Sequence, residues 1–248
     1  MRFPDGVESQ RFFEKRAPNH TPDWVRTAPI EMGSVGLLEF IVCDDRPTLV
    51  WLAQLAALEL HPSLSLAKKP DQPTVIAFDL DPGDPATIVE CAKVGLIVRG
   101  LFEDLGLESF PKTSGSKGLQ VYVPLNRKVT YEQTKHYARA VAQALERSEP
   151  DLVVSKQKKE LRKGKVLVDW SQNDRAKTTV AVYSLRCRPR PWVSTPLHWD
   201  EVEELADDGD LESVRFEAGD VLQRVEKHGD LFAPVLELEQ KLPEQPGR

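Results

Sequence analysis

The sequence has few cysteines and no long hydrophobic run. Its 248 residues include three cysteines, Cys43, Cys91 and Cys187, which are widely spaced and form no CxxC pair. This pattern argues against a disulfide framework or a zinc ribbon and is typical of a reducing compartment. The longest apolar stretch, residues 49–60, is interrupted by two polar residues and is too short to cross a bilayer. We therefore expect a cytoplasmic protein with no membrane partner.

Net positive charge is also absent. The sequence has 33 Lys+Arg against 39 Asp+Glu, a net charge of -6, which by itself argues against a polyanionic partner. The charges are segregated, however: residues 200–248 hold 15 acidic and 5 basic residues, whereas residues 156–190 hold 11 basic and 3 acidic ones. The acidic tail therefore masks a basic segment. That segment is either a solvated surface loop or a surface that follows a phosphate backbone.

The hydrophobic pattern indicates one domain over residues 1–248, with 200–248 as an acidic helical C-terminal part of the same unit. It predicts strands at 37–43, 74–81, 109–112, 119–124, 166–170 and 179–184, helices at 49–60, 86–104 and 130–148, and two or three short acidic helices from residue 199. Asp84 and Pro85 are expected to begin the second helix, and Thr130 with Gln133 the third. Strands mixed with helices favour an α+β fold with a mixed sheet.

Three aspartates end predicted strands. Asp79 and Asp81 are two residues apart in TVIAFDLD, so both carboxylates project from one face of the strand. Asp169 ends VLVDW in the same way. Carboxylates this close repel each other unless a cation lies between them, and Mg²⁺ or Mn²⁺ prefers such oxygen ligands. Three of them could hold two ions about 4 Å apart for phosphoryl displacement. A DxD pair alone also occurs in sugar-nucleotide transferases and exposed turns.

A glycine-rich segment, SGSKG, separates two predicted strands. Its backbone amides, the hydroxyls of Ser114 and Ser116, and the charge of Lys117 could together bind an anion. The GxxxxGK[ST] spacing of a Walker A loop is missing. An ordinary hairpin turn is the alternative interpretation.

Other candidates are isolated along the sequence. His61 follows an apolar run and is either a structural or a nucleotide-contacting histidine. Arg186 follows a predicted strand and could donate two hydrogen bonds to a phosphate. Phe12 and Phe13, near Lys15, are either core residues or an exposed pair that stacks on a base.

Four motifs, FDLDP, TSGSKGL, GKVLVDWSQN and YSLR, occur in this order. Together they resemble the polymerase domain of bacterial ATP-dependent DNA ligase D, of the archaeo-eukaryotic primase superfamily, from about residue 3 to about residue 232. The resemblance implies a primase-type catalytic core of mixed and antiparallel sheets flanked by helices. It also implies a nucleotidyltransferase that adds nucleotides to DNA ends, or fills short gaps, in non-homologous end joining.

The resemblance further implies roles for individual residues and partners. The catalytic and metal-binding residues are Asp79, Asp81 and Asp169, with two Mn²⁺ or Mg²⁺ ions. The nucleotide-binding residues are His61, Ser114, Ser116, Lys117, Gln120, Gln172 and Arg186, and the DNA-binding residues are Phe12, Phe13, Lys15, Lys156, Lys158 and Lys159. The expected partners are DNA ends or gapped DNA and nucleoside triphosphates, with ribonucleotides as the candidate preference. Ku and a ligase are further candidate partners.

Two departures from the family pattern carry their own expectations. Many members have a histidine where this sequence has Gln120, and glutamine cannot act as a cation. Members usually carry basic residues ahead of the segment that begins here at Met1, so recognition of a downstream 5′-phosphate is expected to be weak. The departures leave an alternative function, a catalytically weak module that holds DNA ends for a partner ligase. A sugar-nucleotide transferase would use Asp79 and Asp81 but leave Asp169 without a role.

Overall fold

Strand β3 (Val75–Pro82) lies at the centre of a five-stranded sheet. The computed structural model describes residues 1–188 and 190–243. The strand order is β4 (Phe110–Thr113), β5 (Leu119–Pro124), β3, β7 (Val166–Asp169) and β6 (Val153–Val154). Only the β6–β7 pair of this sheet is parallel. The prediction of an α+β fold with a mixed sheet is confirmed.

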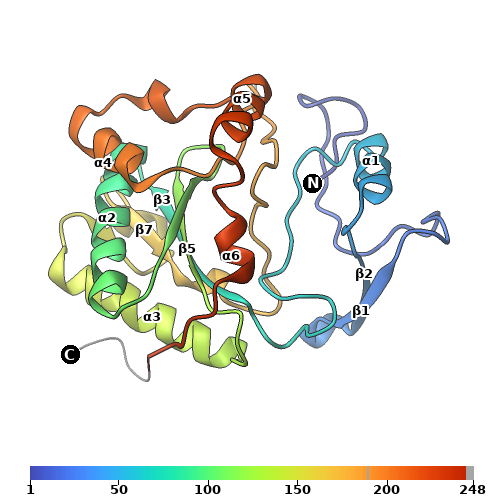
Figure 1. Cartoon of the computed structure of the whole chain (residues 1–248), viewed down its shortest axis with the longest axis horizontal. Coiled ribbons are helices and arrows are strands. Elements are labelled where there is room, and N and C mark those ends of the chain that lie inside the picture. The colour runs from blue at the N-terminus through green and yellow to red at the C-terminus, as the bar shows by residue number, and fades with distance from the viewer. Residues whose placement is uncertain (189, 244–248) are drawn as a thin grey trace.

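One face of the sheet is covered by helices α2 (Ile88–Asp104) and α3 (Tyr131–Ser148) (Figure 1). The fully buried side chains of Ile76, Phe78 and Leu80 pack into the core on this face. Because successive side chains of a strand point to opposite faces, the alternate residues of β3 face away from these helices. This geometry directs Asp79 and Asp81 to the open face.

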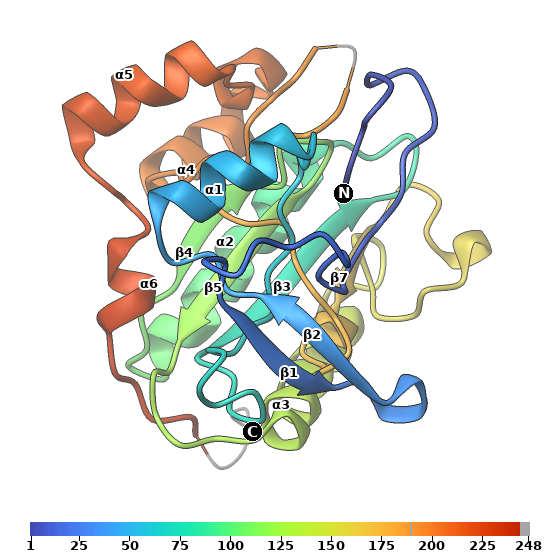
Figure 2. The same ribbon diagram turned by 90° about the vertical axis from the view of Figure 1, so that its right-hand side faces the viewer.

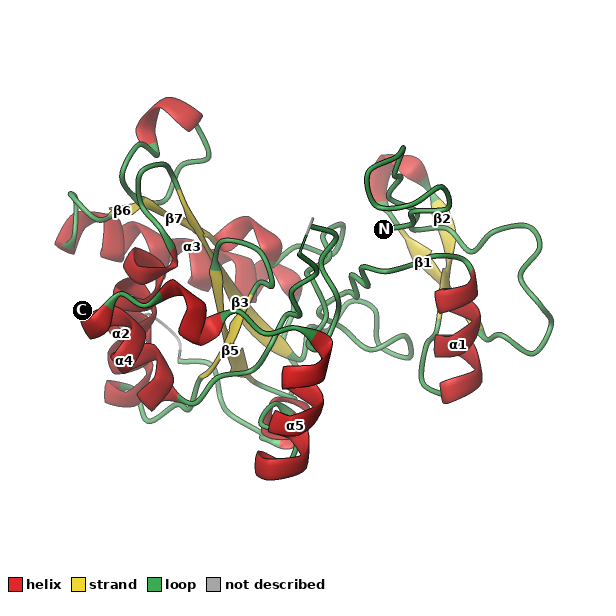
Figure 3. Ribbon diagram, turned by 90° about the horizontal axis from the view of Figure 1, so that it is seen from above, coloured by secondary structure: helices red, strands yellow, loops and turns green. Residues whose placement is uncertain are grey.

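The open face looks toward the N-terminal part of the chain. There, β1 (Thr27–Glu31) and β2 (Leu37–Ile41) form an antiparallel hairpin beside helix α1 (Arg46–Gln54). Figure 2 shows these elements in front of the five-stranded sheet, and Figure 3 shows them set apart from it, on the side away from α2 and α3. The strand expected at 37–43 is therefore present but ends at residue 41.

The predicted bounds of α1, 49–60, are wrong. The Asp45 carboxylate accepts a hydrogen bond from Thr48 N at 2.8 Å, so this residue caps a helix that begins before the predicted residue 49. The helix ends at Gln54, and Ala56 follows with a positive φ of 53°. Residues 57–62 leave the helix and approach the sheet, which brings His61 to the open face.

The expected start of α2 at Asp84 and Pro85 is also wrong. Thr87 caps this helix instead, and the Glu90 carboxylate accepts a hydrogen bond from Thr87 N at 2.6 Å. For α3 the prediction is confirmed: Gln133 N donates to Thr130 Oγ1 at 3.2 Å, and Gln133 accepts from Thr130 N.

The strand predicted at 179–184 is wrong as well. Thr179 N and Ala181 N donate to the carbonyls of Pro62 and Leu60, so this segment contacts the residues after α1 and joins no sheet. Tyr183 has a φ of 63°, which interrupts the extended backbone.

The C-terminal part forms the short helices that the sequence predicts. They are α4 (Trp199–Asp208), α5 (Ala218–His228) and α6 (Ala233–Glu237), and the 3₁₀ turns of the chain are Gly33–Val35, Lys159–Leu161, Trp170–Gln172 and Leu211–Val214. Phe232 and Val235 pack with Tyr122 of β5. None of the helices among the described residues is long and apolar enough to span a membrane.

Candidate active site

Four polar residues form a row across the open face of the sheet. Lys112 of β4 is the register partner of Gln120 of β5, which pairs with Asp79 of β3, which pairs with Asp169 of β7. Directly opposed residues of antiparallel strands project from the same face. Asp81 lies two residues further along β3, on the same side. The register therefore places the three aspartates on the same face, near one end of the sheet.

Asp79 lies between an amide and two other carboxylates. Gln120 Nε2 donates a hydrogen bond to Asp79 Oδ1 at 3.0 Å. Burial and the nearby charges of Asp169 and Asp81 raise the pKa of Asp79 to about 6, against the lowering effect of Gln120 and of the Lys112 charge. A divalent cation would relieve this repulsion.

Asp81 is held by two cations. Arg162 Nη2 forms an ion pair with Asp81 Oδ2, and Lys117 Nζ lies 3.7 Å from Oδ1. Lys117 also donates to the carbonyl of Pro82 at 3.2 Å. Arg162 comes from the basic segment, which therefore reaches the acidic site.

Asp169 is more deeply buried, with 8% of its surface exposed. Its Oδ1 accepts hydrogen bonds from Ser171 Oγ at 2.6 Å and from Gln157 Nε2 at 3.1 Å, and its Oδ2 accepts from Gln172 Nε2 at 3.0 Å. Gln172, predicted to bind nucleotide, thus contacts a predicted metal ligand. Gln157 lies within the basic segment, residues 156–190, and was not among the residues predicted for the site.

The donor chemistry fits a divalent cation, although the side chains are satisfied by other partners. Among residues 1–188 and 190–243, no three Asp, Glu, His or Cys side chains are gathered as a ligand set for a metal ion. Each aspartate instead accepts hydrogen bonds or pairs with neighbouring side chains, namely Gln120, Arg162, Lys117, Gln157, Ser171 and Gln172. Those neighbours would have to give up part of these contacts for an ion to bind.

The SGSKG turn joins β4 to β5 beside the aspartates. Ser114 Oγ accepts hydrogen bonds from Gly118 N at 3.1 Å and from Ser116 N at 3.3 Å, so these amides point at the serine hydroxyl. A Cβ atom on Gly118 would lie 2.3 Å from the carbonyl oxygen of Leu80. Glycine at this position therefore lets the turn lie directly against β3.

A cavity of about 320 Å³ opens over the two central residues of the row, Gln120 and Asp79, and over the turn. It is lined by all seven residues predicted to bind nucleotide, namely His61, Ser114, Ser116, Lys117, Gln120, Gln172 and Arg186, together with Asp79 and Asp81. Three further polar lining residues, Thr178, Thr179 and Arg188, were not predicted from the sequence. Their only sequence signal was their position inside or beside the basic segment.

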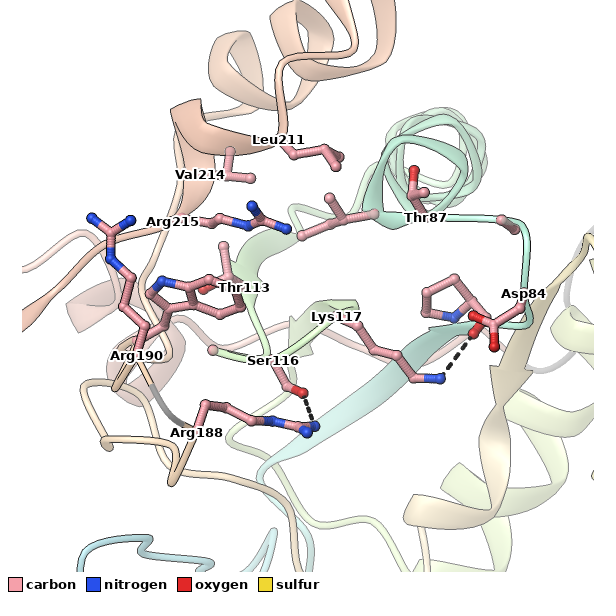
Figure 4. A pocket seen from close by; sticks show the side chains of 15 residues that line it. Asp84, Thr87, Thr113, Ser116, Lys117, Arg188, Arg190, Leu211, Val214 and Arg215 are labelled. Atoms are coloured by element: carbon pink, nitrogen blue, oxygen red, sulfur yellow. Dashed lines mark hydrogen bonds between the residues drawn. The ribbon is translucent and has the colours of Figure 1, made fainter. Parts of the chain in front are cut away.

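A second cavity, of about 550 Å³, lies on the other side of the turn (Figure 4). It shares Ser116, Lys117 and Arg188 with the first cavity, and Arg188 donates a hydrogen bond to Ser116 Oγ. Its other two cations are paired with acidic residues, Arg190 with Glu217 and Arg215 with Glu212. Its apolar lining includes Ile88 of α2 and Leu211 and Val214 of the 3₁₀ turn Leu211–Val214.

The residues predicted to bind DNA fall into two groups. Phe12 and Phe13 are 39% and 45% exposed, and the Phe13 ring lies 5.4 Å from the His61 ring, centroid to centroid. Lys15 Nζ lies 5.7 Å from the Phe13 ring and donates to the Ala176 carbonyl at 2.7 Å. This aromatic group therefore adjoins the first cavity.

The second group consists of three lysines at the start of the basic segment. Lys156, Lys158 and Lys159 are exposed on the loop between β6 and β7 and do not line the cavity. The loop is anchored beside the site, because Gly164 N donates to the carbonyl of Gly83 at 3.0 Å. The lysines thus form a flank of the acidic site.

The family of this chain follows from its similarity to known proteins. Residues 1–232 match the family described as LigD, primase-polymerase domain. The chain is 43% identical over 236 residues to the multifunctional non-homologous end joining protein LigD of Mycolicibacterium smegmatis, covering 94% of this chain and 30% of that protein. It is 32% identical to the bifunctional LigD of Bacillus subtilis, covering 94% of this chain and 36% of that protein. The chain thus spans about a third of the length of these relatives.

A solved structure gives the same result for the fold. The polymerase domain of Mycobacterium tuberculosis ligase D in complex with DNA superposes with a TM-score of 0.86 and 39% identity, covering 94% of this chain and 82% of that one. Family match, relatives and fold agree over nearly the whole chain. This protein belongs to the LigD primase-polymerase domain family.

Proposed function

We propose that this protein is a metal-dependent nucleotidyltransferase that adds nucleotides to DNA ends, or fills short gaps, in double-strand break repair by non-homologous end joining. The observation that supports the proposal is that three aspartates share one face of the sheet, beside a cavity lined by Asp79, Asp81 and the residues predicted to bind nucleotide. Its family membership and the DNA complex of its relative support the same activity.

Asp79, Asp81 and Asp169 would hold two Mn²⁺ or Mg²⁺ ions. When bound, such ions activate the primer 3′-hydroxyl and neutralise charge on the departing pyrophosphate. The protein's own carboxylates supply hard oxygen ligands for them, and Gln120 and Gln172 orient two of these carboxylates through amide hydrogen bonds.

The triphosphate of the incoming nucleotide would lie along the SGSKG turn. Lys117 and Arg186 line the cavity there and would stabilise the negative charge that develops on the leaving group. Arg186 Nη1 donates to the Ser114 carbonyl at 3.0 Å, which orients the guanidinium over the turn. Ser114 and Ser116 would contribute hydroxyl donors, and His61, which also lines the cavity, would contact the nucleotide.

DNA would approach along both flanks of the site. The exposed Phe12 and Phe13 would stack on a template base, while Lys15, Lys156, Lys158 and Lys159 contact phosphates. The proposed partners of the repair reaction are DNA ends or gapped DNA, nucleoside triphosphates with ribonucleotides preferred, Ku and a ligase.

The decisive experiment is manganese-dependent extension of a primer with a 3′-overhang. Asp79→Ala should abolish nucleotide addition, because the central carboxylate of the row is removed. Asp208→Ala changes an exposed aspartate of α4 and should extend the primer at the wild-type rate. Undiminished extension by Asp79→Ala would contradict the proposal.

A gap-filling assay extends the test to the substrate. Gapped DNA with a downstream 5′-phosphate and the same DNA without it should both be filled, because the proposed chemistry needs only the primer 3′-hydroxyl and a nucleoside triphosphate. Filling of neither gap in the presence of Mn²⁺ would contradict the proposed chemistry.

A further inference from the structure

A buried carboxylate lies behind the nucleotide-binding residues. Glu59 follows α1 in the connection toward the sheet and is 5% exposed. It is absent from the lining of the first cavity, so it does not meet a nucleotide there. A carboxylate this deeply buried is stable only when it is paired and hydrogen-bonded.

The partners of Glu59 are two of the residues proposed to bind nucleotide. Its Oε2 lies 3.1 Å from His61 Nε2, and its Oε1 lies 3.3 Å from Arg186 Nε. Oε1 also accepts a hydrogen bond from the backbone N of Cys187 at 2.9 Å. The contact with Arg186 is an ion pair rather than a hydrogen bond, since the N–H is not directed at the oxygen.

These contacts join two distant parts of the chain. His61 belongs to the segment that enters from the N-terminal part, whereas Arg186 belongs to the segment that follows β7. The backbone reinforces the junction, because Leu60 N donates to Ser184 Oγ at 2.9 Å and Ala181 N donates to the Leu60 carbonyl at 2.9 Å. Glu59 is therefore the charged group at the contact between the two segments.

The charge of Glu59 is permanent under ordinary conditions. Burial alone would raise its pKa, but hydrogen bonds from His61 and from Cys187 N, together with the Arg186 charge, lower it to about 2. A group that remains ionised from mildly acidic to alkaline pH is unsuited to proton transfer in this range. It is well suited to orienting cationic and polar side chains.

We infer that Glu59 is a positioning residue for nucleotide binding, which holds His61 and Arg186 in the orientation that receives the incoming triphosphate. This inference rests on the nucleotide site proposed above. Because His61 Nε2 is engaged with Glu59, Nδ1 is the ring nitrogen left for the nucleotide. Arg186 Nε lies in the ion pair with Glu59 and Nη1 donates to the Ser114 carbonyl, so Nη2 is left for phosphate.

The test separates nucleotide binding from turnover. Glu59→Gln keeps the size of the side chain and can still accept from Cys187 N, but it loses the charge that orients both partners. We expect KM for the nucleoside triphosphate to rise by about tenfold, the scale of one hydrogen bond to a charged group, with kcat changed by less than about twofold. Glu59→Asp keeps the charge and should restore part of the affinity.

A matched control removes a carboxylate elsewhere. Glu201 also pairs with an arginine, Arg224, at 2.6 Å, but it lies in α4, away from the cavity. Glu201→Gln should leave the nucleotide KM unchanged, whatever its effect on the melting temperature. An equal rise in KM for both variants would show a general loss of structure and would overturn the inference.

A double-mutant cycle tests whether Glu59 acts through its partners. The effect of Glu59→Gln on KM should shrink to about twofold or less in an Arg186→Lys background, because the guanidinium to be oriented is already absent. Full additivity would overturn the inference. If Glu59→Gln does not fold, a double-mutant cycle of His61→Asn and Arg186→Lys replaces it. Both residues contact the Glu59 carboxylate, so their effects on KM should be coupled, and full additivity would overturn the inference.

Failure of the inference can be told apart from failure of the proposed function. Nucleotide binding to the wild-type protein, measured by fluorescence anisotropy with a labelled nucleoside triphosphate and Mn²⁺, tests the site itself. Wild-type binding with an unchanged Glu59→Gln variant would overturn the role of Glu59 alone. No binding by the wild type would overturn the proposed function and, with it, the inference.

Discussion

Asp79 of β3 and Asp169 of β7 are direct register partners, so two carboxylates oppose each other across an antiparallel strand pair. Such a like-charge pair destabilises a sheet unless a cation compensates it. Burial, and with it the repulsion from Asp169 and Asp81, raises the pKa of Asp79. The divalent ions proposed above would relieve this repulsion, so the pair is consistent with a functional site that lowers local stability.

Substituting Asp79→Asn should therefore have opposite effects on stability and on activity. The pKa of Asp79 lies at about 6 in the folded protein, above its ordinary value of 3.8, so ionisation at neutral pH costs stability. In the metal-free protein at pH 7.5, the free energy of unfolding should increase by about 1–3 kcal/mol. Urea denaturation in the presence of EDTA measures this change in the free energy of unfolding. Primer extension by the same variant should be abolished. A decrease in metal-free stability would contradict the electrostatic interpretation.

Lys112 should make stability depend on pH in the alkaline range. This fully buried lysine donates to Ser194 Oγ at 2.6 Å, and burial lowers its pKa to about 7 from an ordinary value of 10.5, despite the opposing effect of the Asp79 charge. Between these pH values the unfolded chain binds more protons, so this group makes the free energy of unfolding rise with pH.

Lys112→Met should remove that contribution. The stability of the wild type relative to the variant should increase from about pH 7 to about pH 10, by at most about 1.4 kcal/mol per pH unit. Denaturation at several pH values measures the difference, and parallel curves for the two proteins would contradict it. Because tyrosine and cysteine titrations are common to both proteins, they cancel in the comparison.

Two glycine substitutions should differ in sign. Gly118→Ala would place a Cβ atom 2.3 Å from the Leu80 carbonyl oxygen, and because that atom is backbone, the turn must move away from β3. We expect a decrease of more than about 2 kcal/mol in stability together with weaker nucleotide binding. Gly100 lies inside α2 with open space around it, so Gly100→Ala should be neutral or stabilise by up to about 1 kcal/mol. Thermal denaturation of the two variants and of the wild type measures both changes in stability.

Binding to DNA should weaken steeply with salt, despite a sequence pI of about 5.5. Replacing Lys156, Lys158 and Lys159 by glutamine should reduce the slope of log affinity against log salt by about 0.9 for each DNA phosphate that the variant no longer neutralises. Arg127 and Lys128 are exposed at the opposite end of β5, and their replacement serves as the control. Equal slopes for both variants, or a wild-type affinity that does not change with salt, would contradict the proposed DNA surface.

Much of the site could be recognised in the sequence because its components are local. Period-two alternation is a property of any strand, so Asp79 and Asp81 had to share a face once TVIAFDLD was assigned as a strand. The SGSKG motif identified the turn and four motifs identified the family. The capping pair Thr130 and Gln133 could also be recognised in the sequence, because it depends on residues only three positions apart.

The misplaced elements show where local patterns mislead. The strand expected at 179–184 has a suitable apolar composition, but its backbone donors pair with residues 60–62, far away in the sequence. The helix expected at 49–60 begins earlier, since Asp45 caps it, and ends earlier, before the chain turns toward the sheet. In both places a distant contact or a capping side chain outweighed local hydrophobicity.

From the sequence alone follow the fold family, the charge segregation and the identity of the acidic, glycine-rich and arginine-bearing motifs. Only the tertiary structure decides which of these residues lie next to one another. It forms the row Lys112, Gln120, Asp79 and Asp169, and it places Glu59 between His61 and Arg186. Strand register and the closure of long loops create these contacts. Glu59 meets Cys187 N across 128 positions, a separation at which the periodicity of the chain carries no information.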